Sequence, residues 1–190
     1  MAKYYKAGDH IAELCKTAFQ QRADAVAAAL KISRRLGGSR TRVAFQTGFY
    51  GRLDITGFVF DGKQRPDASL LKSHNHDASI WTPRLGCKAG KALQKELDDL
   101  SVPYLEPVMD AIGMSPSHFG GEGVSRRVPG ILEIAGDYYL TLPDDVKPKG
   151  CTRISDIAFE AFVAEHNAKE KAAKLAKKGK AKKGKASKCR

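Results

Sequence analysis

Apolar positions repeat at helical spacing over one long stretch near the N-terminus. From residue 9 to residue 35, apolar side chains recur three to four positions apart, and the Ala-rich middle favours helix and close packing. Asp9 is predicted to cap the start of this helix, and Arg35 suits the negative end of its dipole. Gly37 then ends the helix. A short edge strand is predicted just before it, at residues 3–6.

Two pairs of later segments have the composition of β-hairpins. Residues 42–47 and 54–60 alternate or are rich in Val, Phe and Ile, which predicts two paired strands. Residues 131–135 and 138–142 flank a Gly-Asp pair, a two-residue turn of the kind that closes hairpins. Three glycines in and around the first pair are candidate positions for a β-bulge or for close approach of another backbone: Gly48, Gly51 and Gly57.

Two further helices are predicted from the remaining pattern. One covers residues 88–100, and a short helical turn follows at 108–112. The last helix is predicted to start at Ser155 or Asp156, either of which can serve as its N-cap. Residues 63–86 show no clear period and are predicted to be irregular. The buried side of the central helix is predicted to consist of Leu93, Leu97 and Leu100.

The order of elements predicts the fold class. Hairpins dominate over strand–helix–strand crossovers, which favours an antiparallel sheet with helices packed on it. The sequence therefore predicts an α+β fold: one antiparallel sheet of four or five strands, with a long N-terminal helix, a central helix and a C-terminal helix. A chain of 190 residues suits one such domain plus an appendage.

Charge separates that appendage from the domain. Residues 169–190 contain ten Lys and one Arg but one Glu, a net charge of +10. Residues 1–168 carry 22 Lys plus Arg against 20 Asp plus Glu, a net charge of +2. We therefore predict a nearly neutral globular domain over 1–168 and a Lys-rich tail over 169–190, helical in part and disordered in part.

The cellular setting is indicated by what the sequence lacks. No apolar run approaches the ~20 residues of a membrane span. The first residues also lack the apolar centre of a secretion signal, so the cytoplasm is expected. The four cysteines form no Cys-x-x-Cys pair, which argues against a zinc ribbon and favours free thiols. Among them, Cys15 falls on the apolar face of the long helix and is predicted to be buried.

The segment around the single Trp has the most candidate chemistry. Arg84, Lys88 and Lys91 lie within eight residues, at the predicted start of the central helix. A helix N-terminus attracts anions, so these cations are candidates to hold a phosphate, with Trp81 stacking on a base. The glycine spacing is not that of a Walker A motif. The alternative is a buried Trp beside a solvated helix start.

Two further segments are candidate phosphate sites. Arg126 and Arg127 follow a Gly-rich stretch whose backbone N–H groups can cradle an anion, although a surface loop is the alternative. The tail attracts phosphates without sequence preference, and such binding weakens with salt. It holds no aromatic residue, so stacking on bases is not expected there. A solubilising role or contact with an acidic partner is the alternative. The tail candidates are Lys177, Lys178, Lys180, Lys182, Lys183 and Lys185.

Metal and acid–base chemistry have weaker signals. His74, His76 and Asp77 resemble half of a metal site, because alternating strand positions would point both imidazoles to one face and Asp77 could add an oxygen ligand. No further ligand has a diagnostic spacing, so a polar loop is the alternative. The carboxylate pairs at 98–99 and 144–145 are interpreted as solvated surface. No catalytic residue and no cofactor are predicted.

Several segments together resemble a known group of proteins. These are the Ala-rich helix ending in Leu36, the Thr-Gly-Phe-Val-Phe strand at 56–60, the Trp-Thr-Pro-Arg to Lys-Ala-Gly-Lys stretch at 81–91, and Pro143 after the late hairpin. Their order resembles that of small uncharacterised proteins of tailed bacteriophages and prophages. The resemblance implies a phage or prophage setting, and hence a bacterial cytoplasm. It implies no catalytic residue, and the tail lies outside it.

The sequence leads to one leading hypothesis and two alternatives. The leading hypothesis is a non-enzymatic accessory protein that binds nucleic acid, or a nucleotide or phosphate ligand, through the basic tail and the cationic helix start. The first alternative is an effector that binds and inhibits a host protein, since this needs an interface and no catalytic motif. The second is a metal-dependent hydrolase that uses His74, His76 and Asp77.

Overall fold

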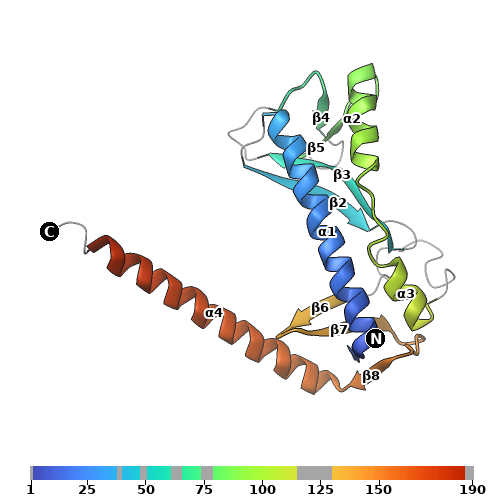
Figure 1. The fold of residues 1–190 in the computed structure, drawn as a ribbon, viewed down its shortest axis with the longest axis vertical. Coiled ribbons are helices and arrows are strands. Elements are labelled where there is room, and N and C mark those ends of the chain that lie inside the picture. The colour runs from blue at the N-terminus through green and yellow to red at the C-terminus, as the bar shows by residue number, and fades with distance from the viewer. Residues whose placement is uncertain are drawn as a thin grey trace.

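The fold consists of two four-stranded sheets joined by one long helix (Figure 1). The computed structural model describes residues 2–37, 40–47, 51–60, 66–73, 79–114 and 130–186. The elements are β1 (Ala2–Ala7), α1 (Asp9–Arg35), β2 (Thr41–Thr47), β3 (Leu53–Phe60), β4 (Leu71–Ser73), β5 (Ile80–Pro83), α2 (Lys88–Asp98), α3 (Glu106–Ile112), β6 (Gly130–Ile134), β7 (Asp137–Pro143), β8 (Cys151–Ile154) and α4 (Asp156–Ala186).

The predicted α+β class with antiparallel pairing is confirmed, and the strands divide between two sheets. Sheet A has the strand order β6-β7-β1-β8, and sheet B has the order β2-β3-β5-β4. Each predicted hairpin forms half of one sheet. Of the other strands, β1 was predicted, whereas β4, β5 and β8 come from segments too short to show a period of their own. The prediction of β1 as an edge strand was wrong, because it lies between two partners: Tyr5 pairs with Leu140 on β7 and with Arg153 on β8.

Helix α1 confirms the long predicted helix and connects the two sheets. Its first half lies beside sheet A and its second half beside sheet B (Figure 1). Small buried side chains such as Ala18, Ala25 and Ala29 allow close packing along its length. Residues of both sheets, among them Tyr5 and Phe58, therefore share one hydrophobic core with α1. The N-cap residue is Gly8 rather than the predicted Asp9, which is the first residue of the helix.

Strand β3 contains a β-bulge that changes which side chains reach the core. Ala44 pairs with Gly57 and Phe45 pairs with Ile55, so that Thr56 is an extra residue on β3. On a regular strand, residues three positions apart point to opposite faces. The extra residue shifts this alternation, so that Ile55 and Phe58 are both buried. The bulge lies in the middle of sheet B.

Two short strands lie within the described part of the segment 63–86, which was predicted to be irregular. Strand β5 pairs with β3 on one side and with β4 on the other, and Leu71 and Pro83 on these strands are buried. The N–H of Arg84 donates to the carbonyl oxygen of Leu70 at 2.8 Å and extends this pairing. The prediction failed here because strands of three and four residues are too short to show alternation.

The remaining predictions for helices and turns need small corrections. Helix α2 buries Leu93 and Leu97 as predicted, but it ends at Asp98, so Leu100 lies beyond it and is half-buried. The short helix predicted at 108–112 starts earlier, at Glu106, because Pro107 lies in its first turn, where a missing N–H costs little. The β6–β7 turn is formed by Ala135 and Gly136, both at positive φ, one residue earlier than predicted. Strand β8 was not predicted.

Candidate nucleic-acid interface

The base of α4 is anchored to sheet A by aromatic residues. Phe159 is 8% exposed, and its ring stacks on Tyr4 with 4.0 Å between ring centroids. Tyr139 on β7 adds an edge contact to the same ring. The N–H of Ala158 donates to the hydroxyl oxygen of Ser155 at 3.3 Å, which confirms Ser155 as the capping residue. These contacts fix the direction in which α4 leaves the body.

Beyond this base, α4 extends away from the rest of the protein. The helix continues to Ala186, and among the described residues no other helix or strand lies beside its distal half (Figure 1). The predicted boundary at 168/169 is therefore not a break in secondary structure. Residues 169–186 contain nine Lys and one Glu and span about 27 Å at 1.5 Å per residue.

The first lysine of this stretch is paired within the helix. Lys169 Nζ lies 2.6 Å from Glu165 Oε1, four residues earlier. The hydrogen bond from Lys169, together with its charge, lowers the pKa of Glu165. Both side chains are exposed, so this pair adds little to stability. Among the lysines that follow, repulsion between positions three and four apart disfavours the helix, and bound anions would relieve it.

The structure places Trp81 in the middle of sheet B. It pairs with the fully buried Phe58 on β3 and with Ser73 on β4, and its half-buried side chain packs against the main core. Side chains alternate along a strand, so Thr82 points to the opposite face of the sheet. Trp81 thus contributes to the core, and only part of its ring is accessible for stacking on a base.

The start of α2 is capped by its own chain. The N–H of Gly90 donates to the Sγ of the N-cap residue Cys87 at 3.3 Å. A Cβ at Gly90 would overlap the carbonyl oxygen of Arg84, so this oxygen lies against the first turn. This carbonyl oxygen carries partial negative charge, so it would repel an anion bound at the first turn of α2. Lys88 and Lys91 are exposed on the helix surface, as is the Arg84 side chain.

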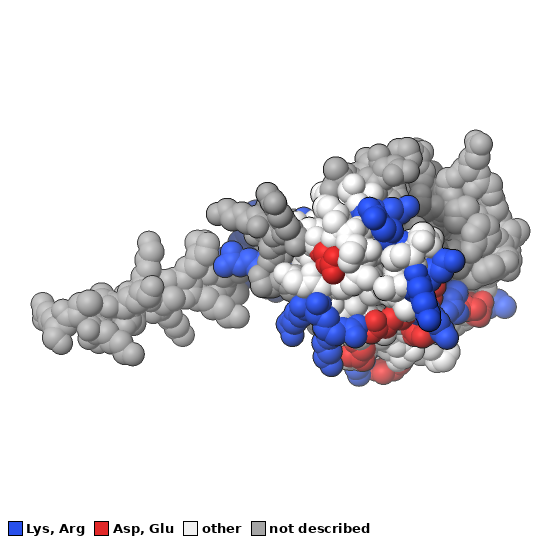
Figure 2. Space-filling view, turned by 90° about the horizontal axis from the view of Figure 1, so that it is seen from above, with Lys and Arg blue, Asp and Glu red and all other residues white. Residues whose placement is uncertain are grey.

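Two of the predicted cationic regions, the tail and the start of α2, lie at opposite ends of the described structure. Sheet B and α2 form one end, whereas α4 leaves from sheet A at the other (Figure 1). Figure 2 shows that Lys, Arg, Asp and Glu side chains are interspersed on the end that carries sheet B. The tail and the start of α2 therefore do not form one continuous basic surface.

Several predicted site residues lie outside the described part of the chain. These are Arg126 and Arg127 of the Gly-rich segment, and His74, His76 and Asp77. For the six tail lysines, the structure gives the helical backbone only. Within the described residues, no group of three or more His, Cys, Asp or Glu side chains is arranged to hold a metal ion. In the same part of the chain, no helix is long and apolar enough to cross a membrane.

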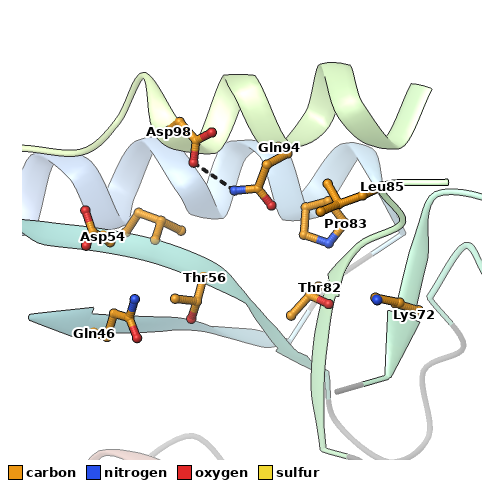
Figure 3. Close-up of a pocket in the computed structure, with 10 residues that line it drawn as sticks. Gln46, Asp54, Thr56, Lys72, Thr82, Pro83, Leu85, Gln94 and Asp98 are labelled. Atoms are coloured by element: carbon orange, nitrogen blue, oxygen red, sulfur yellow. Dashed lines mark hydrogen bonds between the residues drawn. The ribbon is translucent and has the colours of Figure 1, made fainter. Parts of the chain in front are cut away.

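Sequence reasoning missed a polar groove between α2 and sheet B. Its volume is about 380 Å³, and it lies beside the β-bulge at Thr56 (Figure 3). Its residues come from five separate elements, which no sequence spacing could connect. The one signal in the sequence was a pair of aspartates at a helix end. The groove is lined by Gln46, Asp54, Ile55, Thr56, Lys72, Thr82, Pro83, Leu85, Gln94 and Asp98.

Comparison of the chain with protein-family models, with curated proteins and with solved structures finds no match. The resemblance to small phage and prophage proteins therefore stays a prediction.

Proposed function

We propose that this chain is a non-enzymatic binding protein that holds nucleic acid through the distal half of α4. The observation that carries the proposal is the extension of this Lys-rich helix beyond the last aromatic contact with the body. Contacts with Tyr4 and Tyr139 hold the base of the helix, so the body presents the cationic half in a set direction. The phage or prophage setting is part of this proposal and rests on the resemblance alone.

The length of the cationic helix favours a polyanion over a small phosphate ligand. Its nine lysines are distributed over about 27 Å, whereas duplex DNA carries one negative charge per ~1.7 Å of axis. The major groove, about 12 Å wide, accommodates one α-helix. The tail has no aromatic residue to stack on exposed bases, so contact with the phosphates of a duplex is expected, without sequence preference.

The proposal is tested by neutralising one cationic region at a time. In the tail variant, Lys177, Lys178, Lys180, Lys182, Lys183 and Lys185 are replaced by Gln, which keeps helix propensity and removes six charges. The matched variant replaces Arg84, Lys88 and Lys91 by Gln. Binding to a random-sequence duplex is measured by gel retardation at low salt.

The two variants are expected to differ strongly. The tail variant should lose at least about 100-fold in affinity, because counterion release scales with the number of phosphates neutralised. The matched variant should bind within about threefold of the unchanged chain. A larger loss in the matched variant would show that the main contacts with the duplex are made at the start of α2. Failure of the unchanged chain to retard any duplex would reject the proposal.

A protein partner is the second candidate, and one observation favours it. An apolar groove of about 370 Å³ lies beside the edge strand β2, where Phe45 is 38% exposed. Phe19 and Val26 on α1 form its other wall, and the Arg22 guanidinium lies 4.6 Å from the Phe45 ring centroid. Exposed edge strands accept an extended segment of another chain.

This second candidate has its own test. A host protein recovered from nuclease-treated lysate by the unchanged chain should be lost with Phe45→Asp and retained with the variant neutralised at Arg84, Lys88 and Lys91. Equal recovery by both variants would show that the groove at Phe45 is not the interface.

A further inference from the structure

The polar groove beside α2 has two ends of opposite charge. Asp54 and Asp98 lie toward one end, and Lys72 on β4 lies at the other (Figure 3). The hydroxyls of Thr56 and Thr82 lie between them, as the figure shows. A groove of about 380 Å³ has the size of a site for a small molecule.

Ser101 is hydrogen-bonded to both aspartates at the acidic end, to the backbone of Asp98 and to the carboxylate of Asp54. Its backbone N–H donates to the carbonyl oxygen of Asp98 at 3.0 Å, and its hydroxyl donates to Asp54 Oδ1 at 2.8 Å. Gln94 Nε2 donates to Asp98 Oδ1 at 2.8 Å. These bonds orient both carboxylates through Oδ1. An ionised carboxylate accepts several hydrogen bonds, so capacity remains for a donor in the groove.

The end of α2 adds a further negative potential at the same place. Asp98 is the last residue of the helix and Asp99 is its C-cap. The C-terminal end of a helix carries partial negative charge, and cations are the residues that stabilise it. Two aspartates there act against the stability of α2. Such local preferences are broken mainly at functional sites, and the rest of the fold offsets the cost.

We infer that this groove binds a small zwitterion, with a guanidinium or ammonium group between Asp54 and Asp98 and a carboxylate at Lys72. A guanidinium has five N–H donors and can therefore bond to more than one carboxylate, and the amides and hydroxyls along the groove suit a polar chain between the two charges. An amino acid with a basic side chain is the simplest ligand of this class. The site is independent of α4 and of its proposed role.

The composition of the groove favours this class over a metal ion or a phosphate. A divalent metal takes six or more oxygen ligands with several carboxylates, and the groove offers two. A phosphate would meet one lysine and two carboxylates, and the carboxylates repel it. A ligand with separated charges satisfies both ends.

Three probes of matched shape test the inference on the full chain. L-arginine carries both charges, L-citrulline replaces the guanidinium by a neutral group of the same shape, and agmatine lacks the carboxylate. Titration calorimetry should show saturable binding of L-arginine, with L-citrulline at least about tenfold weaker and agmatine about fivefold weaker.

Variants locate the two ends of the ligand. Asp98→Asn should weaken L-arginine at least about tenfold, whereas Asp99→Asn, at the same helix end but outside the lining of the groove, should weaken it by no more than about twofold. Lys72→Met should make L-arginine and agmatine bind equally well, because the group that distinguishes them is gone. The exposed positions of Asp98 and Lys72 make loss of folding unexpected in these variants.

Several results would overturn the inference. Equal binding of L-citrulline and L-arginine would show that the acidic end does not bind the guanidinium. Equal binding of agmatine and L-arginine to the unchanged chain would show that Lys72 does not bind the carboxylate. Displacement of L-arginine by magnesium or calcium ions at equimolar concentration would identify a metal site instead. Absence of saturable L-arginine binding would reject the site.

Discussion

At the scale of single residues, close backbone contacts decide where glycine is required. The sequence marked Gly51 and Gly57 as positions of a bulge or of close approach, and the structure confirms both. Gly57 lies at the bulge and faces the carbonyl oxygen of Trp81. The residue it faces could not be predicted, because β5 was not recognised as a strand. Gly48 lies outside the described residues.

The first prediction concerns Gly57. A Cβ at this position would overlap the Trp81 carbonyl oxygen, which is backbone and cannot turn away. Gly57→Ala should therefore lower the free energy of unfolding by about 2 kcal/mol, as overpacking in a sheet does. Gly86→Ala is the matched control, because a Cβ added there would meet no described atom within 4 Å beyond its chain neighbours. Urea unfolding measures both, and equal midpoints for the two variants would contradict the account.

The second prediction concerns the buried thiol of Cys15. Burial raises its pKa from 9.0 to about 12, and the side chain is 0% exposed, as the sequence predicted. In the unfolded chain the thiol ionises near 9.0, so the contribution of the neutral thiol is full below pH 9 and is lost as pH rises toward about 12. For each chain, the free energy of unfolding is measured relative to its value at pH 8. Over that range it should fall less in Cys15→Ala than in the unchanged chain. Parallel pH profiles for the two chains would show that another group is responsible.

At the scale of elements, periodic segments were predictable and short strands were not. Helix α1, helix α2 and both hairpins follow from their patterns. Strands β4, β5 and β8 contain three or four residues each, and they exist because longer strands pair with them. Such strands are a consequence of tertiary structure, which no local pattern encodes. For the same reason, the division into two sheets was not predicted.

The third prediction concerns the anchor of α4. Phe159 joins Tyr4 and Tyr139 in a small buried cluster, so Phe159→Ala should lower the free energy of unfolding by about 2 to 3 kcal/mol. The amides in the first turns of α4 should then exchange hydrogen much faster. Phe162→Ala, at a side chain that is 43% exposed, should have less than half of this effect. Equal effects of the two substitutions would show that Phe159 is not the main anchor.

At the scale of the whole molecule, the distribution of charge was the most predictable property. The tail was located from composition alone, and the structure places it on a helix that leaves the body. The relation between the tail and the start of α2 could not be predicted, because it depends on the packing of two sheets along α1. The polar groove was unpredictable for the same reason, since Asp54, Lys72 and Asp98 lie on separate elements.

The fourth prediction follows from the separation of tail and body. Removal of residues 169–190 deletes one exposed ion pair, Lys169 with Glu165, and no buried side chain among the described residues. The free energy of unfolding should change by less than about 0.5 kcal/mol at about 0.15 M salt. Thermal unfolding of the two chains measures this. A much lower midpoint for the shortened chain would mean that the tail contributes to folding.

The salt dependence of duplex binding tests the central claim most directly. Each phosphate neutralised contributes about −0.9 to the slope of log K against log salt, so the full chain should show a slope of about −5 or steeper. Replacement of the six tail lysines from Lys177 to Lys185 by Gln should remove about five units of that slope. The account predicts this change for the tail and a change of less than about one unit for the variant neutralised at Arg84, Lys88 and Lys91. A slope that is the same with and without the tail lysines would contradict it.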